Sequence, residues 1–200
     1  MVSKNLIDIK ENDIIRYDGE LLPILLKDNS SNLNIIWATD NYQHLGEDYD
    51  FFAQIRSELI SGENGNIIKP RVSKKKEDQI ARTKGKAEVF TPSWICNNMN
   101  NLVDNSWFES ENMFNTETEK GWITNLNPIQ FPDKDGKTWQ DYVKSTRLEI
   151  TCGEAPYLVS RYDTITGKAI AVQDRIGLLD RKLRVVSENL NDEKEWCKWL

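Results

Sequence analysis

The sequence predicts a mixed α/β fold built in two parts. Two apolar runs, at positions 21–26 and 35–39, flank turn-forming residues and predict a β-hairpin in the first part. In the second part, a Thr-Pro pair precedes an apolar stripe at helical spacing. An apolar run then leads into a glycine turn at Gly153 with a proline three residues later, which is typical of a β–α unit.

The first part, positions 1–66, is expected to be a small α+β cap. After the hairpin, apolar residues recur at helical spacing and predict a short amphipathic helix: Phe51, Phe52, Ile55 and Leu59. Glycine and asparagine at 61–66 end this helix. The single histidine, His44, stands among polar residues and is expected to be a solvated loop residue rather than a catalytic one.

Composition excludes several classes of protein. The 200 residues are 29 % charged and contain no run of about 18 apolar residues that could span a membrane. The N-terminus lacks the apolar run of a secretory signal. Cys96, Cys152 and Cys197 are far apart, so disulfide scaffolds and zinc ribbons are not expected, and one histidine argues against three-histidine metal sites. We therefore expect a cytoplasmic protein without a metal site.

Positive charge is concentrated in one stretch, 67–86, which is predicted to be a basic linker. It holds eight bases and two acids, so it carries +6, whereas the whole chain carries -6 and the remainder therefore -12. Such a strip can contact the phosphates of DNA, and it can equally be a solvated charged face. The candidate DNA-binding residues are Lys74, Lys75, Lys76, Arg82 and Lys84.

The second part, 87–200, begins with a predicted helix from Pro92 to about Val103. Thr91 is a good N-cap, and proline suits the first helical position because its missing N–H is not needed there. The stripe consists of Trp94, Ile95, Met99, Leu102 and Val103. The following segment, 104–146, has poor periodicity but seven aromatic residues. We expect these rings to anchor it to the core, although one or two could stack nucleobases.

The segment 147–159 carries the candidate ligand site. A strand through Ile150, a turn at Cys152 and Gly153, and a helix begun by Pro156 would present free backbone N–H groups to an anionic group. Glu149, at the end of the strand, could accept a hydrogen bond from an ammonium or hydroxyl group of the same ligand. By spacing alone this signal is weak, because every β–α unit needs a turn.

Two motifs resemble those of the amino-group DNA methyltransferases. Leu-Glu-Ile-Thr-Cys-Gly-Glu-Ala-Pro-Tyr-Leu, at 148–158, resembles motif I, often Leu-Asp-Pro-Ala-Cys-Gly-Ser-Gly-Ala-Phe-Leu in adenine-modifying members. Ala-Glu-Val-Phe-Thr-Pro, at 87–92, resembles motif X, usually Gly-x-Phe/Tyr-Thr-Pro. Motif X precedes motif I, as in that family, and the wider context is similar to methylase subunits of restriction–modification systems.

The resemblance implies a Rossmann-like domain at 87–200 that binds S-adenosylmethionine at the strand ends. The matching positions in this chain imply that the methionine portion of S-adenosylmethionine is surrounded by Cys152, Gly153, Glu154 and Ala155. Glu149 would face the charged groups of the cofactor. Phe90, Thr91 and Pro92 would close the other side, and Tyr157 would pack beneath the loop. Ala155 stands where the family has the second motif-I glycine, and this replacement is tolerable only if Ala155 has a negative φ. Pro156 removes one backbone N–H donor from the start of the helix.

The family's catalytic motif, Asp/Asn/Ser-Pro-Pro followed by an aromatic residue, is absent, because no Pro-Pro pair occurs in the chain. The helical pattern that starts at 192 also stops without a cap. We therefore expect an incomplete domain: the N-terminal part of an adenine-N6 DNA methyltransferase, inactive alone, whose partners are double-stranded DNA and a missing catalytic part or restriction subunit. The alternatives are a non-catalytic docking or regulatory module and a methyltransferase acting on RNA or protein.

Overall fold

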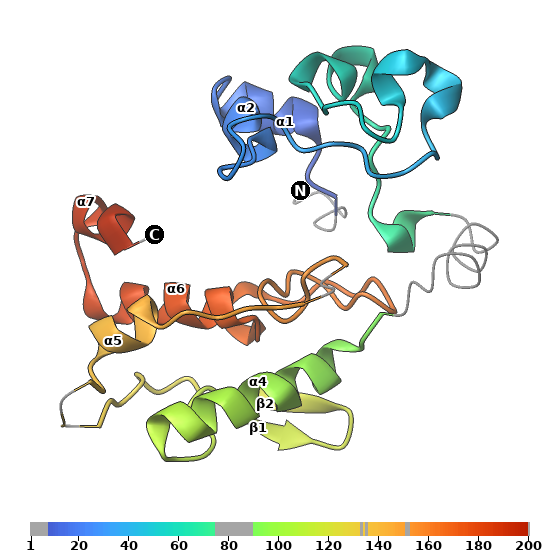
Figure 1. Cartoon of the computed structure of the whole chain (residues 1–200). Helices are drawn as coiled ribbons and strands as arrows, with labels where there is room; N and C mark the ends of the chain where they lie inside the picture. Colours follow the sequence, from blue (N-terminus) through green and yellow to red (C-terminus); the bar gives the residue numbers. More distant parts are fainter. Residues whose placement is uncertain (1–7, 75–89, 133, 135, 151–152, 200) are drawn as a thin grey trace. The chain divides into compact units, whose positions relative to one another are not determined.

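The chain divides into two compact units, Met1–Pro70 and Arg71–Leu200, in the computed structural model (Figure 1). The structure describes residues 8–74, 90–132, 134, 136–150 and 153–199. The boundary between the units falls inside the stretch 67–86 that the sequence marks as a linker.

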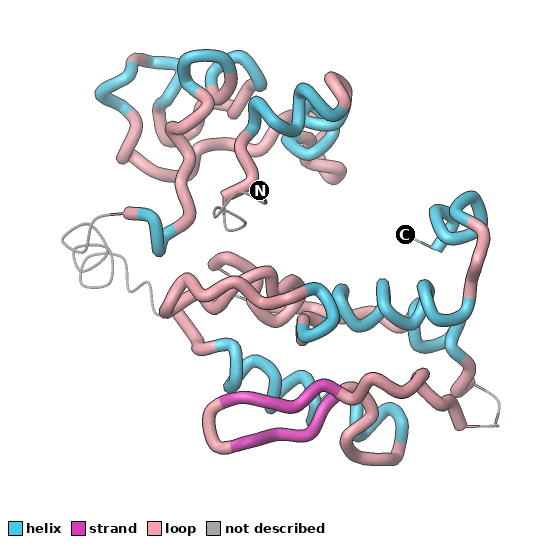
Figure 2. The backbone as a smooth tube through the Cα atoms, turned by 180° about the vertical axis from the view of Figure 1, so that it is seen from behind, coloured by secondary structure: helices cyan, strands magenta, loops and turns pink. Residues whose placement is uncertain are grey.

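The regular secondary structure described in the first unit is helical, and loops and turns make up the rest. It contains α1 (Glu11–Tyr17) and α2 (Leu21–Leu26), followed by short 3₁₀ turns. These turns are Gln43–Leu45, Glu47–Tyr49, Ser57–Leu59 and Gly62–Asn64. Extended pairing in the described part of this unit consists of isolated bridges, between Lys27 and Asn34 and between Ile36 and Gln54. Figure 2 accordingly shows short helices joined by loops here.

The predicted hairpin is wrong in its first strand, because Leu21–Leu26 forms α2. Pro23 lies in the first turn of this helix, where a missing N–H breaks no intrahelical hydrogen bond, and leucine favours helix. The intervening turn does form: the Asp28 carboxylate accepts from the backbone and hydroxyl of Ser30. Hydrogen bonds, first from the Ser31 hydroxyl, lower the pKa of Asp28 to about 2.

The helix predicted from Phe51 to Leu59 is also wrong. Of the run predicted to be extended, residues 35–37 pair as extended backbone, whereas Ala38 has a φ of +49° and ends the extension. One partner is this segment: Trp37 N donates to Ala53 O at 3.1 Å and Ile55 N to Ile35 O at 2.8 Å. These bonds occupy backbone groups that a helix would need. Phe52 is 81 % exposed, and His44 is exposed in a short 3₁₀ turn, as expected.

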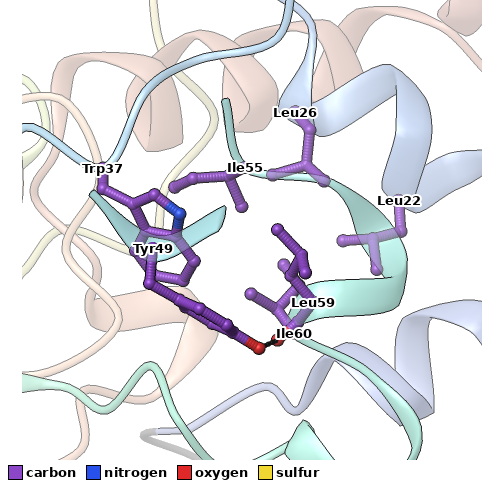
Figure 3. Packing of buried hydrophobic residues seen from close by; sticks show 7 residues of the cluster. All are labelled: Leu22, Leu26, Trp37, Tyr49, Ile55, Leu59 and Ile60. Atoms are coloured by element: carbon purple, nitrogen blue, oxygen red, sulfur yellow. Dashed lines mark hydrogen bonds between the residues drawn. The ribbon is translucent and has the colours of Figure 1, made fainter. Parts of the chain in front are cut away.

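A single cluster of apolar side chains forms the core of the first unit (Figure 3). Its buried members are Leu22, Leu26, Trp37, Tyr49, Ile55, Leu59 and Ile60. The two polar groups among them are satisfied: Tyr49 Oη donates to Leu59 O at 3.1 Å and Trp37 Nε1 to Asp48 O at 3.0 Å. The two buried leucines of α2, Leu22 and Leu26, are four positions apart, so one face of this short helix points into the cluster.

The second unit combines helices with a two-stranded antiparallel sheet. Its elements are α4 (Ser93–Phe108), β1 (Asn115–Thr118), β2 (Gly121–Thr124), α5 (Trp139–Lys144), α6 (Leu178–Asn189) and α7 (Glu193–Trp196). Asn115 pairs with Thr124 in the register of the sheet. The hairpin lies beside α4, and α5 packs on α6 (Figures 1 and 2).

The mixed helix-and-strand character is confirmed, whereas the parallel sheet of a Rossmann-like domain is not seen in the described residues. Within these residues, pairing in the second unit consists of the hairpin and one bridge between Tyr162 and Ala169. The hairpin lies within the segment 104–146, whose sequence has poor periodicity. No helix in the described ranges combines the length and apolarity needed to cross a membrane.

Aromatic residues hold the segment 104–146 in place, as predicted. Phe108, Phe114 and Tyr142 are buried together, with ring centroids 5.2 to 6.0 Å apart. A capping box between Thr138 and Asp141 begins α5 and brings Tyr142 into this cluster.

Helix α4 is predicted correctly, but its buried face is not the apolar stripe. It runs to Phe108 and ends at Glu109, whose φ is +56°. Met99, Leu102 and Val103 of the predicted stripe are exposed. The face packed inward is largely polar instead, with Cys96, Asn97, Asn100, Asn101 and Asp104 buried.

The buried polar face of α4 surrounds Arg181 of α6, which is 1 % exposed. Arg181 donates from Nη1 to Asp104 Oδ2 at 2.7 Å and from Nη2 to the Oδ1 atoms of Asn97 and Asn101. Tyr142 of α5 donates from Oη to Asp104 at 3.1 Å. This Arg181 network joins α4, α5 and α6, and it explains why polar residues occupy the inner face of α4.

Candidate ligand cavity

The N-terminus of α4 forms one side of the candidate site. Pro92 is the N-cap and Ser93 the first helical residue, so the start predicted from Thr91 is displaced by one position. Asp163, from a distant loop, supplies the missing cap: its Oδ2 accepts from Ser93 N at 2.7 Å. Burial raises the pKa of Asp163, but hydrogen bonds, first from the Ser93 amide, outweigh it and leave that pKa below its ordinary value. Thr164 Oγ1 donates to Thr91 O at 3.0 Å and fixes the residues before the helix.

A tight turn at 153–159 forms the other side. The predicted strand through Ile150 and the helix from Pro156 do not form in the described residues: 147–150 is irregular and 156–158 is a turn. Leu158 N and Val159 N both donate to Ala155 O, at 3.1 and 2.9 Å. Gly153 and Ala155 both have φ of +50°, a conformation that helical or extended backbone does not adopt.

From the sequence, alanine at position 155 is expected to be tolerated only at negative φ, but Ala155 has a positive φ. An L-residue with a side chain in the left-handed region costs about 1–2 kcal/mol relative to the right-handed one. Gly153, at the same φ, carries no such strain. The turn thus combines an unstrained glycine, Gly153, with a strained alanine, Ala155. Contacts with the rest of the unit must stabilise the backbone at Ala155.

A cavity of about 460 Å³ lies between these two sides. Its lining residues are Phe90, Thr91, Met99, Asn100, Val103, Leu148, Glu149, Ile150, Gly153, Pro156, Tyr157 and Leu178. A Cβ atom built on Gly153 would lie 3.4 Å from Cε1 of Phe90, so the two sequence motifs are neighbours here. Segments that are distant in the chain therefore share one cavity.

Most residues that line the cavity are apolar and a few are polar, as is usual in a small-molecule site. Thr91, Asn100 and Glu149 supply polar side chains. The rim is open to solvent, because Leu148 is 83 % and Ile150 74 % exposed.

Glu149 turns back onto the glycine turn. Its Oε2 accepts from Leu158 N at 3.2 Å. Burial raises the pKa of Glu149 above its ordinary value, although backbone hydrogen bonds from Leu158 and Tyr157 oppose this effect. A partly buried carboxylate with a raised pKa is suited to a cationic or hydrogen-bond-donating ligand group, which would favour its ionised form.

Tyr157 packs between the turn and α4 and also lines the cavity. Its hydroxyl donates to Met99 Sδ at 3.2 Å. Burial raises the pKa of Tyr157. Nearby Cys96 is fully buried, and burial raises the pKa of its thiol to about 12, so this cysteine is a packing residue and not a nucleophile.

The predicted cofactor-binding residues take different positions. Phe90, Thr91, Glu149 and Gly153 line the cavity. Pro92 instead caps α4, Glu154 Oε2 accepts from Tyr162 Oη at 2.7 Å, and Ala155 accepts the hydrogen bonds of the turn. Cys152 lies outside the described residues.

Only one of the candidate DNA-binding residues falls within the described part of the chain. This residue is Lys74, which makes an interaction of its own. Lys75, Lys76, Arg82 and Lys84 lie outside the described residues, so their role in DNA binding stays a prediction.

Sequence reasoning missed Asn100 and Asp163. The run Asn97–Asn98–Met99–Asn100–Asn101 contains a signal for the first: asparagine is unfavourable inside a helix, so several in succession indicate that their side chains have specific partners. Asp163 is 70 residues from the amide that it caps, and no local pattern indicates that pairing.

Comparisons of the chain with family models, curated proteins and solved structures found no match. Its function is therefore inferred from the two motifs and from the cavity that they share.

Proposed function

We propose that the second unit binds S-adenosylmethionine in the cavity between α4 and the glycine turn. We further propose that the chain is part of an adenine-N6 DNA methyltransferase of a restriction–modification system. One observation supports this most strongly: Phe90 and Thr91, from the segment that resembles motif X, line the same cavity as Glu149 and Gly153, from the segment that resembles motif I.

The residues present fit such a ligand. The volume lies within the roughly 300–1,000 Å³ of small-molecule pockets. Glu149 would accept from the ammonium group, and the Thr91 hydroxyl would donate to the carboxylate. Met99, Val103 and Leu148 offer apolar surface to the adenosine portion. When bound, the cofactor supplies an electrophilic methyl group, and the residues named here bind and orient it.

Methyl transfer itself is assigned to a part outside this chain. The polar–Pro-Pro–aromatic motif that accepts from the target amine and stacks the flipped base does not occur in the 200 residues. The proposed role of this chain is therefore cofactor binding together with contact to DNA phosphates through the strip at 67–86. Purified alone, it is expected to incorporate no labelled methyl group into DNA, and steady incorporation would contradict this assignment.

Two glycine variants test the cofactor site. Gly153→Val places a β-branched residue at a φ of +50° beside Phe90, so it is expected to abolish S-adenosylmethionine binding, measured by calorimetry on the whole chain. Gly136→Val is the matched control: its φ is +73°, no described atom lies within 4 Å of the built Cβ, and it does not line the cavity. The control is expected to bind as wild type does.

Negligible binding by the wild type, or equal binding by wild type and Gly153→Val, would overturn the cofactor proposal. A non-catalytic docking or regulatory module would then be the better supported function. Two observations favour that second candidate: α4 exposes Met99, Leu102 and Val103, and residues 147–150, which lead into the glycine turn, form no strand.

A further inference from the structure

Asn100 joins three segments of the second unit. It lies in the middle of α4, it is buried, and it lines the cavity. Its Nδ2 donates to Tyr157 O and to Ile176 O, both at 2.9 Å. The first carbonyl belongs to the glycine turn and the second to the segment that enters α6.

The glycine turn is held through two successive carbonyls, those of Tyr157 and Leu158, and Leu158 O accepts from Leu179 N of α6 at 3.0 Å. Tyr157 O accepts from Asn100 Nδ2 and also from Leu178 N, the first amide of α6, at 2.8 Å. The ring of Tyr157 extends to α4, where its hydroxyl contacts Met99. The strained turn at Ala155 is therefore restrained from the α4 side by one side-chain amide and one tyrosine.

The role of Asn100 is distinct from that of the other buried asparagines of α4. Asn97 and Asn101 accept from Arg181 and contact the β1–β2 hairpin through Asn115. The two hydrogen bonds that Asn100 Nδ2 donates go instead to the cavity side. An apolar residue would suit helix and cavity wall better, so the amide is explained by the two carbonyls that it satisfies.

We propose that Asn100 is a positioning residue that holds the glycine turn against α4 and so sets the separation of the two cavity walls. Where it concerns ligand affinity, this inference rests on the proposed function. Removal of the amide is expected to let the turn open while α4 and α6 stay folded.

Amide hydrogen exchange of the whole chain tests the proposal. In Asn100→Ala, the amides of Leu158 and Val159 are expected to exchange about tenfold faster, relative to the buried amides of Val185 and Val186 in α6. S-adenosylmethionine Kd is expected to rise by about the same factor. Asn101→Ala, on the same helix but outside the cavity lining, is the matched control and is expected to leave the exchange ratio unchanged.

A milder variant covers the case in which Asn100→Ala does not fold. Asn100→Ser keeps one donor and is expected to show the same selective change at a smaller size, against Asn101→Ser. Equal exchange ratios in the Asn100 and Asn101 variants would overturn the inference. So would a selective change in exchange with an unaltered Kd in a chain that binds the cofactor. If the wild type binds no S-adenosylmethionine, the proposed function fails, and the exchange ratio alone still decides whether Asn100 holds the turn.

Discussion

Asp163 shows how one side chain sets the position of the candidate site. The N-cap of α4 is Pro92, which has no side-chain acceptor, so the first amides of the helix need another partner. Asp163 reaches Ser93 N from 70 residues away, and its neighbour Thr164 fixes Thr91. These contacts attach the loop at 163–168 to the wall of the cavity that carries Thr91.

Replacing Asp163 by alanine is expected to cost about 1 kcal/mol of unfolding free energy near neutral pH, the usual value of an N-cap. Because the pKa of Asp163 is lowered in the folded chain, its stabilisation is complete above its unfolded pKa of about 4 and is lost as pH falls through the lower folded value. Urea unfolding at neutral and acidic pH should therefore show a difference from wild type that shrinks in acid.

Glu119→Ala, which removes an exposed acid from the β1–β2 turn, is the control for the change in charge. A difference between Asp163→Ala and wild type that stayed constant down to the most acidic pH would contradict the assignment of the cap.

At the scale of elements, α4 packs against α6 through a buried ion pair and side-chain amides, which meet Arg181 of α6. A buried ion pair contributes little net stability compared with apolar residues of the same shape, but removal of one partner leaves a buried charge unpaired. Asp104 and Arg181 also organise two asparagines and Tyr142, so their pairing specifies how α4, α5 and α6 meet. Burial raises the pKa of Tyr142 well above its ordinary value, so its hydroxyl remains a donor to Asp104.

Arg181→Met and Asp104→Asn are each expected to destabilise the second unit by about 3–5 kcal/mol. The double variant should cost less than the sum of the two, because neither Arg181 nor Asp104 is then left buried without the other. Denaturant unfolding of all four chains gives the coupling free energy. Additive costs would show that the two groups do not act as a pair.

The sequence predicted that α4 exists, but it did not predict which face of the helix is buried. The Thr-Pro start and the apolar stripe predicted the helix, since local propensity and capping act within a few residues. The stripe at Met99, Leu102 and Val103 did not predict the buried face, because that face is chosen by Arg181, which is distant in the chain. The same limit applies to Leu21–Leu26, where a short apolar run fits either strand or helix.

The candidate site was predictable where the signal is local. Phe90, Thr91, Glu149 and Gly153 were identified from two short motifs, and the structure brings them to one cavity. The strand and helix expected around Gly153 were not found in the described residues, because positive φ at Ala155 interrupts the backbone and Glu149 accepts from the turn. Asn100 could not be assigned, since its partners are distant carbonyls.

At the scale of the whole molecule, charge is segregated along the chain. The stretch 67–86 is basic, the remainder is strongly acidic, and the unit boundary lies at Pro70. An acidic body disfavours non-specific adsorption to DNA, so any DNA binding should depend on this strip. The prediction concerns salt dependence rather than affinity alone, because release of counterions reports the number of phosphates neutralised.

Replacing Lys74, Lys75 and Lys76 by alanine is expected to lower the slope of log K against log salt for duplex DNA by about 0.9 for each phosphate that these lysines neutralise. The control replaces three exposed lysines elsewhere, Lys120, Lys168 and Lys198, and changes the net charge by the same amount. Fluorescence anisotropy over a salt series should show a reduced slope for the first variant and an unaltered slope for the control. Equal slopes in the two variants would mean that the strip is ordinary solvated surface, because only a direct interaction with phosphate distinguishes it from three other positive charges.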